Sequence, residues 1–199
     1  MARTLLLVID KQRDFEDDRG ALTSGAAAQA TTPFVVERME AALAAGALVA
    51  CTLDTHQPGT PEFRVWGEAE FREFGPHCLR YSWGWQLVDP VQQVVDRQRL
   101  AGRPIYLIEK PTFDAFLGRV TDGPAEDLGL GLDGLIAKYG ITRVELVGLV
   151  TPICVCHTAK AARQRGLEVA VYEAGVASFS PESHRQGLEE MRAAGCIVL

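Results

Sequence analysis

Short apolar runs alternate with segments of helical periodicity along the whole chain. Each run has the length of a β-strand and is apolar almost throughout, which is typical of strands that a parallel sheet buries on both faces. The last three residues, IVL, are a candidate sixth strand at an edge of the sheet. The five longer runs are Thr4–Asp10, Ala47–Asp54, Pro104–Lys110, Arg143–Leu149 and Glu168–Ala174.

Between these runs, apolar residues recur at helical spacing, and each such segment stops close to a glycine. Glycine readily adopts the left-handed conformation that closes a helix. The predicted helices are Thr32–Ala45, Asp89–Leu100, Leu132–Tyr139, Cys154–Arg165 and Pro181–Ala194. The alternation predicts an α/β fold, a three-layer α/β/α sandwich around a central, mostly parallel sheet of about six strands.

Two stretches carry neither pattern. Thr55–Trp85 is rich in glycine, proline and aromatic residues, and Gly118–Gly134 is rich in glycine and aspartate. Long irregular segments of a compact domain are usually functional or mobile. We therefore expect a single domain, 1–199, with a long active-site loop at about 55–85, and we assign no role to the second stretch.

Composition excludes several classes of function. The formal net charge of −6 argues against nucleic acid as the main partner. No apolar run reaches the roughly 18 residues that a membrane span needs. The first run ends in Asp10 and Lys11 with no small-residue cleavage site, unlike a signal peptide. We expect a cytoplasmic protein whose five cysteines are free thiols, and the odd count raises the question of which thiol is reactive.

Chemically versatile residues stand where the predicted strands end. Asp10, Asp54 and Lys110 end three strands, and Cys154 begins the helix that follows the fourth. Ligands of an open parallel sheet bind at the carboxyl ends of its strands, so these side chains should converge. The helix N-terminus and Lys110 would favour the thiolate of Cys154, and Asp10 could take the thiol proton. The alternative is that Cys154 is a small buried hydrophobe.

Neighbouring cysteines and histidines receive structural interpretations. Two residues along a helix from Cys154, Cys156 should point away from it and pack. The C-x-C-H sequence that ends in His157 does not bring three metal ligands to one face. His184 lies far from the strand ends in sequence, so we expect a structural role for it.

Asp54 and His56 form an Asp-x-His pair that can chelate a divalent ion from an extended segment. His77, within the sequence GPHC, is the best candidate for a third ligand, ahead of Glu70 and Cys78. The alternative is that the two histidines are ordinary polar loop residues.

Three sequence blocks that hold these residues resemble the signatures of the isochorismatase-like cysteine hydrolases. The blocks are DKQRDF from Asp10, KPTFDAF from Lys110 and GLVTPICVCHTA from Gly148, the last being the most specific. The added DTH and GPH blocks make the chain resemble the nicotinamidase (pyrazinamidase) branch. Enzymes of that branch hydrolyse nicotinamide to nicotinic acid and ammonia.

The resemblance implies roles for individual residues. Asp10, Lys110 and Cys154 would form a catalytic triad that works through a thioester. A cis peptide bond just before the Thr151 position would turn the backbone amides of Val150 and Cys154 toward the substrate oxygen.

The resemblance also implies a divalent metal, zinc foremost with manganese or iron as alternatives. Asp54, His56 and His77 would hold the metal, and Glu70 stands at the spacing of a further ligand found in some members.

A small-molecule amide is the expected substrate, and its ring nitrogen would bind that metal. Phe15 resembles an aromatic residue that packs on the substrate ring, and Phe74 stands where the branch often has tryptophan. A homo-oligomer and a role in NAD salvage are further implications.

Departures from the branch concern the pocket. Thr55 stands where tryptophan is usual, and Pro152 stands where aspartate is usual. One alternative is therefore a metal-free N-carbamoyl or ureido amidohydrolase, or an isochorismatase-type hydrolase, of the same superfamily. A second alternative is a non-catalytic relative that binds a ligand or partner. A third is a flavodoxin-like or response-regulator domain, which has acids at its strand ends but needs no cysteine there.

Overall fold

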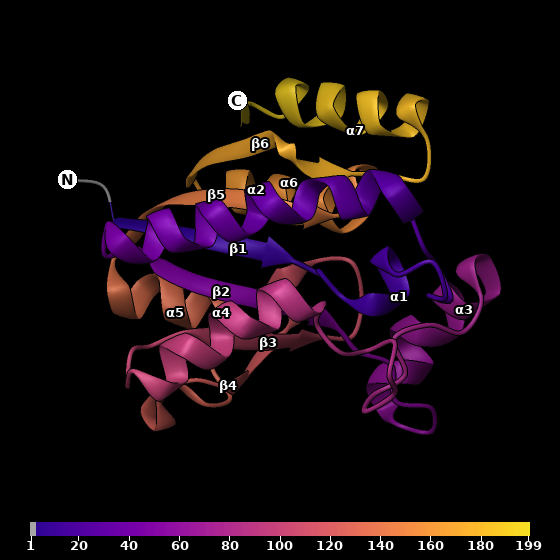
Figure 1. Ribbon diagram of the computed structural model, residues 1–199, viewed down its shortest axis with the longest axis horizontal. Coiled ribbons are helices and arrows are strands. Elements are labelled where there is room, and N and C mark those ends of the chain that lie inside the picture. Colours follow the sequence, from indigo (N-terminus) through magenta and orange to yellow (C-terminus); the bar gives the residue numbers. More distant parts are fainter. Residues whose placement is uncertain (1–2) are drawn as a thin grey trace.

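The computed structural model describes residues 3–199, which form one central sheet between two layers of helices (Figure 1). The sheet has seven strands in the order β4-β3-β2-β1-β5-β6-β7. Every neighbouring pair is parallel except β3 and β4. The strands are β1 (Arg3–Ile9), β2 (Leu48–Asp54), β3 (Tyr106–Lys110), β4 (Arg119–Asp122), β5 (Ile141–Leu149), β6 (Glu168–Ala177) and β7 (Ile197–Val198). The three-layer α/β fold expected from the sequence is confirmed.

Strand β4 corrects the expected number of strands from about six to seven. It lies within the stretch 118–134 that carried no strand pattern, and it pairs antiparallel with β3 at the sheet edge. Only Val120 of its four residues is buried. A four-residue edge strand with one buried side chain has no apolar run, so hydrophobic patterning does not reveal it.

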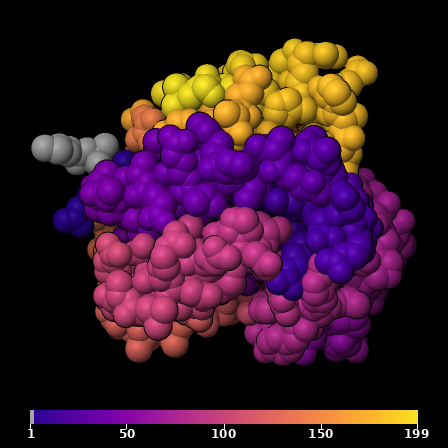
Figure 2. Space-filling model, in the orientation of Figure 1, coloured from indigo at the N-terminus to yellow at the C-terminus, as the bar shows by residue number. Residues whose placement is uncertain are grey.

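Helices α2 (Gly25–Ala44) and α4 (Asp89–Leu100) cover one face of the sheet. In the space-filling view their surfaces lie side by side over that face (Figure 2). Their buried side chains pack on Leu6 and Val8 of β1. Helix α2 begins seven residues before the predicted Thr32, because its first two turns are built from small residues without helical patterning.

Helices α5 (Leu132–Tyr139), α6 (Cys156–Gln164) and α7 (Pro181–Ala193) cover the other face. Their apolar side chains pack on Leu5, Leu7 and Ile9 of β1. The predicted helix from Cys154 is divided in two: a π-helical turn over Thr151–Val155 comes first, and α6 continues from it. None of the helices in the described part of the chain is both long and apolar enough to cross a membrane.

The segment 55–85, expected as a loop, is partly helical. It contains a π-helical turn over Phe63–Gly67 and helix α3 (Glu68–Phe74). An isolated bridge pairs His56, near its start, with Leu79, beyond α3. Figure 1 shows α3 beside the short helix α1 (Arg13–Glu16), near the carboxyl end of β1. The segment therefore covers the sheet edge at which the polar strand ends meet.

Candidate active site

Asp10 follows β1 in a turn that the backbone of β5 makes possible. Its φ angle is +47°, a left-handed conformation that costs free energy in a residue with a side chain. Gly148 of β5 lies against this turn, and a Cβ atom there would meet the Ile9 carbonyl oxygen at 2.0 Å. The Thr52 hydroxyl of β2 donates to Asp10 Oδ1 at 2.6 Å and accepts from the Asp10 N–H at 3.1 Å. These contacts hold the carboxylate at the strand end.

Lys110, at the end of β3, joins the residues that converge on this edge. Its Nζ lies 2.7 Å from Asp10 Oδ2 and 3.5 Å from both Cys154 Sγ and Asp54 Oδ1. It also donates to the Thr112 carbonyl oxygen at 3.0 Å. All four charged or thiol side chains are buried. The four strand-end residues singled out in the sequence therefore meet around one ammonium group.

Burial is the largest single influence on the pKa of each of these side chains. Burial raises the pKa of Cys154 well above its usual value, and the Asp10 and Asp54 carboxylates raise it further, against the opposing charge of Lys110. Lys110 therefore favours the thiolate as expected, but it does not outweigh burial. Burial also raises the pKa of Asp10, although Lys110 opposes this. The pKa of Lys110 is raised well above its usual value, because Asp10 and Asp54 outweigh the effect of burial.

Cys154 lies in a turn that presents backbone amides. The turn Thr151–Val155 follows β5, and the Val150 carbonyl accepts hydrogen bonds from the amides of Ile153 at 3.1 Å and Val155 at 3.4 Å. The cis peptide bond lies between Leu149 and Val150, one bond before the position expected. Backbone N–H groups in such a turn can stabilise an oxyanion that forms beside the Cys154 thiol.

A second cluster of polar side chains lies next to Lys110. Asp54, His56, Glu70 and His77 are all buried, and one ligand atom from each lies within 4.8 Å of the others. Asp54 Oδ2 is 3.1 Å from His56 Nε2 and 3.2 Å from His77 Nε2. The His77 Nδ1 atom lies 2.8 Å from the Gly75 carbonyl oxygen, a contact that directs Nε2 into the cluster.

The donor set of this cluster fits a divalent cation. Both carboxylate oxygens of Glu70 are buried and accept no hydrogen bond from any donor among residues 3–199. Burial, together with the charge of Asp54, raises the pKa of Glu70. Two carboxylates and two imidazoles are ligands that zinc, manganese and iron all accept. Glu70 therefore lies with the three candidate ligands Asp54, His56 and His77, whereas Cys78 is outside the cluster.

One cavity connects the thiol to the cluster. It contains about 10 Å³ of free space, room for about one water molecule. Phe15 and Phe74 both line it, as do Asp54, His77, Val150 and Cys154. The remaining lining residues are Leu22, Phe113, Ile153 and Phe179.

Known proteins match this chain in sequence and in fold. The isochorismatase domain family matches residues 4–199. The chain belongs to the isochorismatase family.

Individual relatives place this family member more narrowly. An uncharacterized isochorismatase family protein, PncA of Bacillus subtilis, is 28% identical over 92% of this chain and 91% of its own. A pyrazinamidase/nicotinamidase of Streptococcus mutans superposes with a TM-score of 0.84, at 27% identity over 98% of this chain and 99% of that one. A pyrazinamidase of Pyrococcus horikoshii in complex with zinc has a TM-score of 0.73, at 25% identity over 99% and 98%. This isochorismatase-family hydrolase is thus an enzyme similar to amidases of the nicotinamidase type.

The structure of this isochorismatase-family hydrolase adds residues that the sequence did not single out. Leu22, Ile153 and Phe179 line the cavity beside Cys154 without belonging to a polar motif. Phe113 also lines it, and its position three residues after Lys110 was the one available signal. Apolar residues are common everywhere in the chain, so their type alone does not mark a cavity wall.

Three residues that were given structural interpretations, Cys156, His157 and His184, lie outside the cavity. Cys156 Sγ contacts Glu190 Oε2 at 3.7 Å, and the ring of the exposed His157 packs on Phe113. His184 lies far from the strand ends in sequence and was expected to have a structural role. Its Nδ1 atom lies 2.9 Å from Thr151 Oγ1, because α7 runs back across the turn that carries the thiol.

Proposed function

We propose that this isochorismatase-family hydrolase cleaves nicotinamide to nicotinic acid and ammonia, with Asp10, Lys110 and Cys154 as its catalytic residues. The observation that carries the proposal is the position of Lys110. Its ammonium contacts the Asp10 carboxylate, the Cys154 thiol and Asp54 of the acidic and histidine cluster at once. A nucleophile, a base and a candidate metal site therefore adjoin one small aromatic-lined cavity.

Asp10 and Cys154 perform the proton transfer and the nucleophilic attack. Asp10 accepts the thiol proton, and the Lys110 ammonium stabilises the charges that result. The Cys154 sulfur attacks the amide carbonyl carbon, while the backbone N–H groups of Val150 and Cys154 stabilise the tetrahedral oxyanion. Asp10 then donates its proton to the departing ammonia. Water hydrolyses the resulting thioester, which releases the acid and restores the thiol.

Asp54, His56 and His77, with Glu70, would hold the divalent metal. A bound metal would supply a Lewis acid for the ring nitrogen of the substrate, and zinc is the first choice, with manganese or iron as alternatives. The zinc complex of the Pyrococcus horikoshii pyrazinamidase supports this choice. Phe15 and Phe74, which both line the cavity, would pack on the ring.

The same resemblance supports proposals about domain organisation, cellular compartment, oligomeric state and biological role. We propose that the chain acts as one hydrolase domain, 1–199, in which segment 55–85 contributes metal ligands and Phe74 to the active site. Five free, buried cysteines fit a reducing compartment such as the cytoplasm. A role in NAD salvage and a homo-oligomeric state complete the proposal, with a small-molecule amide rather than a nucleic acid or a membrane as the partner.

Release of ammonia from a panel of amides tests the proposed function. The panel contains nicotinamide, pyrazinamide and N-carbamoyl amino acids, each assayed with and without added zinc, manganese or iron. We expect metal-dependent turnover of nicotinamide and pyrazinamide. Metal-independent turnover of the N-carbamoyl compounds alone would instead identify the amidohydrolase of the alternative class. No turnover of any compound by folded, metal-loaded protein would favour a binding role.

A further inference from the structure

Helix α7 contacts the turn that carries Cys154 at two points. At Gly187 the helix backbone lies against the turn, because a Cβ atom there would be 2.7 Å from the Pro152 Cα and 3.0 Å from the Thr151 carbonyl carbon. One helical turn earlier, His184 Nδ1 and Thr151 Oγ1 are joined by a hydrogen bond of 2.9 Å. The helix therefore holds the turn through both a close backbone approach and a polar contact.

The hydroxyl of Thr151 depends on this contact. Thr151 is fully buried, and within residues 3–199 its hydroxyl forms a side-chain hydrogen bond with His184 alone. A buried hydroxyl that loses its partner keeps the cost of desolvation without compensation. Thr151 also begins the turn, directly after Val150 and three residues before Cys154. Movement of Thr151 would therefore displace the two amides assigned to the oxyanion.

We propose that His184 is a positioning residue for amide hydrolysis. By holding Thr151, it keeps the Val150 and Cys154 N–H groups directed at the oxyanion. The inference rests on the proposed function, since it concerns the same nucleophile. Small displacements at a reacting centre are costly, and a shift of about 1 Å can lower a rate by roughly 100-fold.

The surroundings of His184 separate this role from a purely structural one. The ring is partly exposed on the wall of a cavity of about 310 Å³, which Phe179 and Ser178 also line. Truncation of His184 enlarges this open cavity and leaves no void in the core. Helix α7 keeps its buried anchors Leu188 and Met191 after such a change. Loss of the ring should thus alter the turn more than the stability of the fold.

Four variants at the helix surface test the proposal by steady-state kinetics with nicotinamide. His184→Ala should lower kcat by about tenfold and leave KM nearly unchanged, because the oxyanion forms only in the transition state. His184→Asn should restore most of the activity, since the asparagine amide can occupy the position of Nδ1. His184→Gln, whose amide reaches the position of Nε2, should not. The exposed neighbour Arg185→Ala should behave as wild type.

A double-variant cycle with Thr151 supplies a second, substrate-free measurement. The rate of Cys154 alkylation by iodoacetamide, followed by mass spectrometry of the Cys154 peptide, is sensitive to the conformation of the turn. This measurement requires no amide substrate. Thr151→Val and His184→Ala should change the alkylation rate by the same factor, and the double variant by no more than either. This measurement stays valid if nicotinamide proves not to be a substrate, so failure of the proposed function is recognised separately.

Three results would overturn the proposal. The first is a kcat for folded His184→Ala equal to that of Arg185→Ala. The second is equal activity of the asparagine and glutamine variants. The third is multiplication of the two single effects on alkylation in the double variant, which would show that the two side chains act independently.

Discussion

Lys110 and Asp10 form an ion pair of 2.7 Å from which solvent is excluded, since neither side chain has any exposed surface. The pair is also the contact between the end of β3 and the end of β1, two strands that are separated by β2 in the sheet. Two opposite charges at this depth stabilise each other only while both are present, and each becomes costly when its partner is removed.

Lys110→Ala should therefore affect both activity and stability. We expect a loss of amide hydrolysis of about 10³-fold or more, because a group that acts with the nucleophile is removed. The free energy of unfolding should fall by about 3–5 kcal/mol, since Asp10 is left buried without a partner. Urea denaturation measures this change. The exposed pair of Lys160 and Glu190 is the control, and Lys160→Ala should cost less than about 1 kcal/mol. Equal losses in the two variants would contradict the prediction.

Cys154 should be the one thiol that turnover requires. Cys154→Ala should abolish ammonia release while circular dichroism shows an unchanged fold, because only the sulfur atom is lost. Cys156→Ala should retain turnover, since its sulfur contacts Glu190 on α7 and does not line the catalytic cavity. Full activity in the first variant with loss in the second would show that the nucleophile has been assigned to the wrong cysteine.

Removal of metal should remove activity. Dialysis against a chelator should yield inactive protein, and metal analysis should show one divalent ion per chain returning with activity. Glu70→Ala should weaken metal binding by about tenfold or more, because a buried carboxylate is lost from the donor set. Glu73 is exposed on the same helix, so Glu73→Ala should bind metal as wild type does. Unchanged activity after complete metal removal would contradict the proposed metal requirement.

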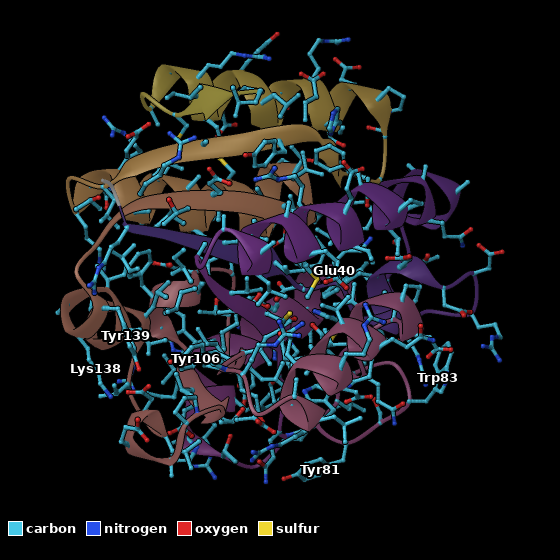
Figure 3. The ribbon with its side chains drawn as sticks, turned by 60° about the vertical axis from the view of Figure 1, so that its left-hand side comes forward. Glu40, Tyr81, Trp83, Tyr106, Lys138 and Tyr139 are labelled. Carbon is cyan, nitrogen blue, oxygen red and sulfur yellow. The ribbon has the colours of Figure 1, made fainter. Side chains whose placement is uncertain are left out.

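Asp127 should make stability depend on pH. It is buried and accepts hydrogen bonds from Tyr106 and Tyr139, and Figure 3 shows both tyrosines with Lys138 at one end of the molecule. Burial raises the pKa of Asp127, but the hydrogen bonds from Lys138 and the tyrosines outweigh it and lower the pKa overall. A carboxyl with a lowered pKa stabilises the fold above its unfolded pKa of about 3.9, and this contribution is lost as pH falls through the folded value.

Asp127→Asn measures that contribution. At pH 7 the variant should be less stable than wild type by about 1.5–3 kcal/mol, the range for hydrogen bonds to a charged group. The difference should begin to shrink as pH falls below about 4, where the unfolded carboxyl takes up a proton, and it should vanish once pH is below the lowered pKa of the folded carboxyl. Chemical denaturation of both proteins at each pH gives the difference directly. A gap that stays constant down to the acid limit of folding would mean that the charge of Asp127 is irrelevant.

The sequence predicted those elements that have a continuous or periodic pattern of apolar residues. Strands buried on both faces need continuous apolar residues, and β1 and β5 show them plainly. The same patterning missed β4, whose single buried Val120 depends on pairing with β3. Helix α2 was predicted too short, because the small residues after Gly25 carry no periodic signal.

The candidate site divides in the same way. Asp10, Asp54, Lys110 and Cys154 were expected to converge because parallel strands bring their carboxyl ends to one edge, and the structure brings all four together. That argument uses only the direction of the strands. It therefore cannot predict that His184, on helix α7, contacts the turn after β5.

By itself, the sequence determined the α/β architecture and the edge at which polar residues gather, because apolar periodicity and strand direction are properties of the chain. The tertiary structure alone decided that Glu70 lies in the buried cluster with the other candidate metal ligands, that burial outweighs Lys110 in setting the pKa of Cys154, and that His184 reaches Thr151. The reason is that desolvation and hydrogen bonding depend on atoms brought within a few ångströms from distant parts of the chain. Their strength cannot be assessed until the whole sheet and its covering helices are in place.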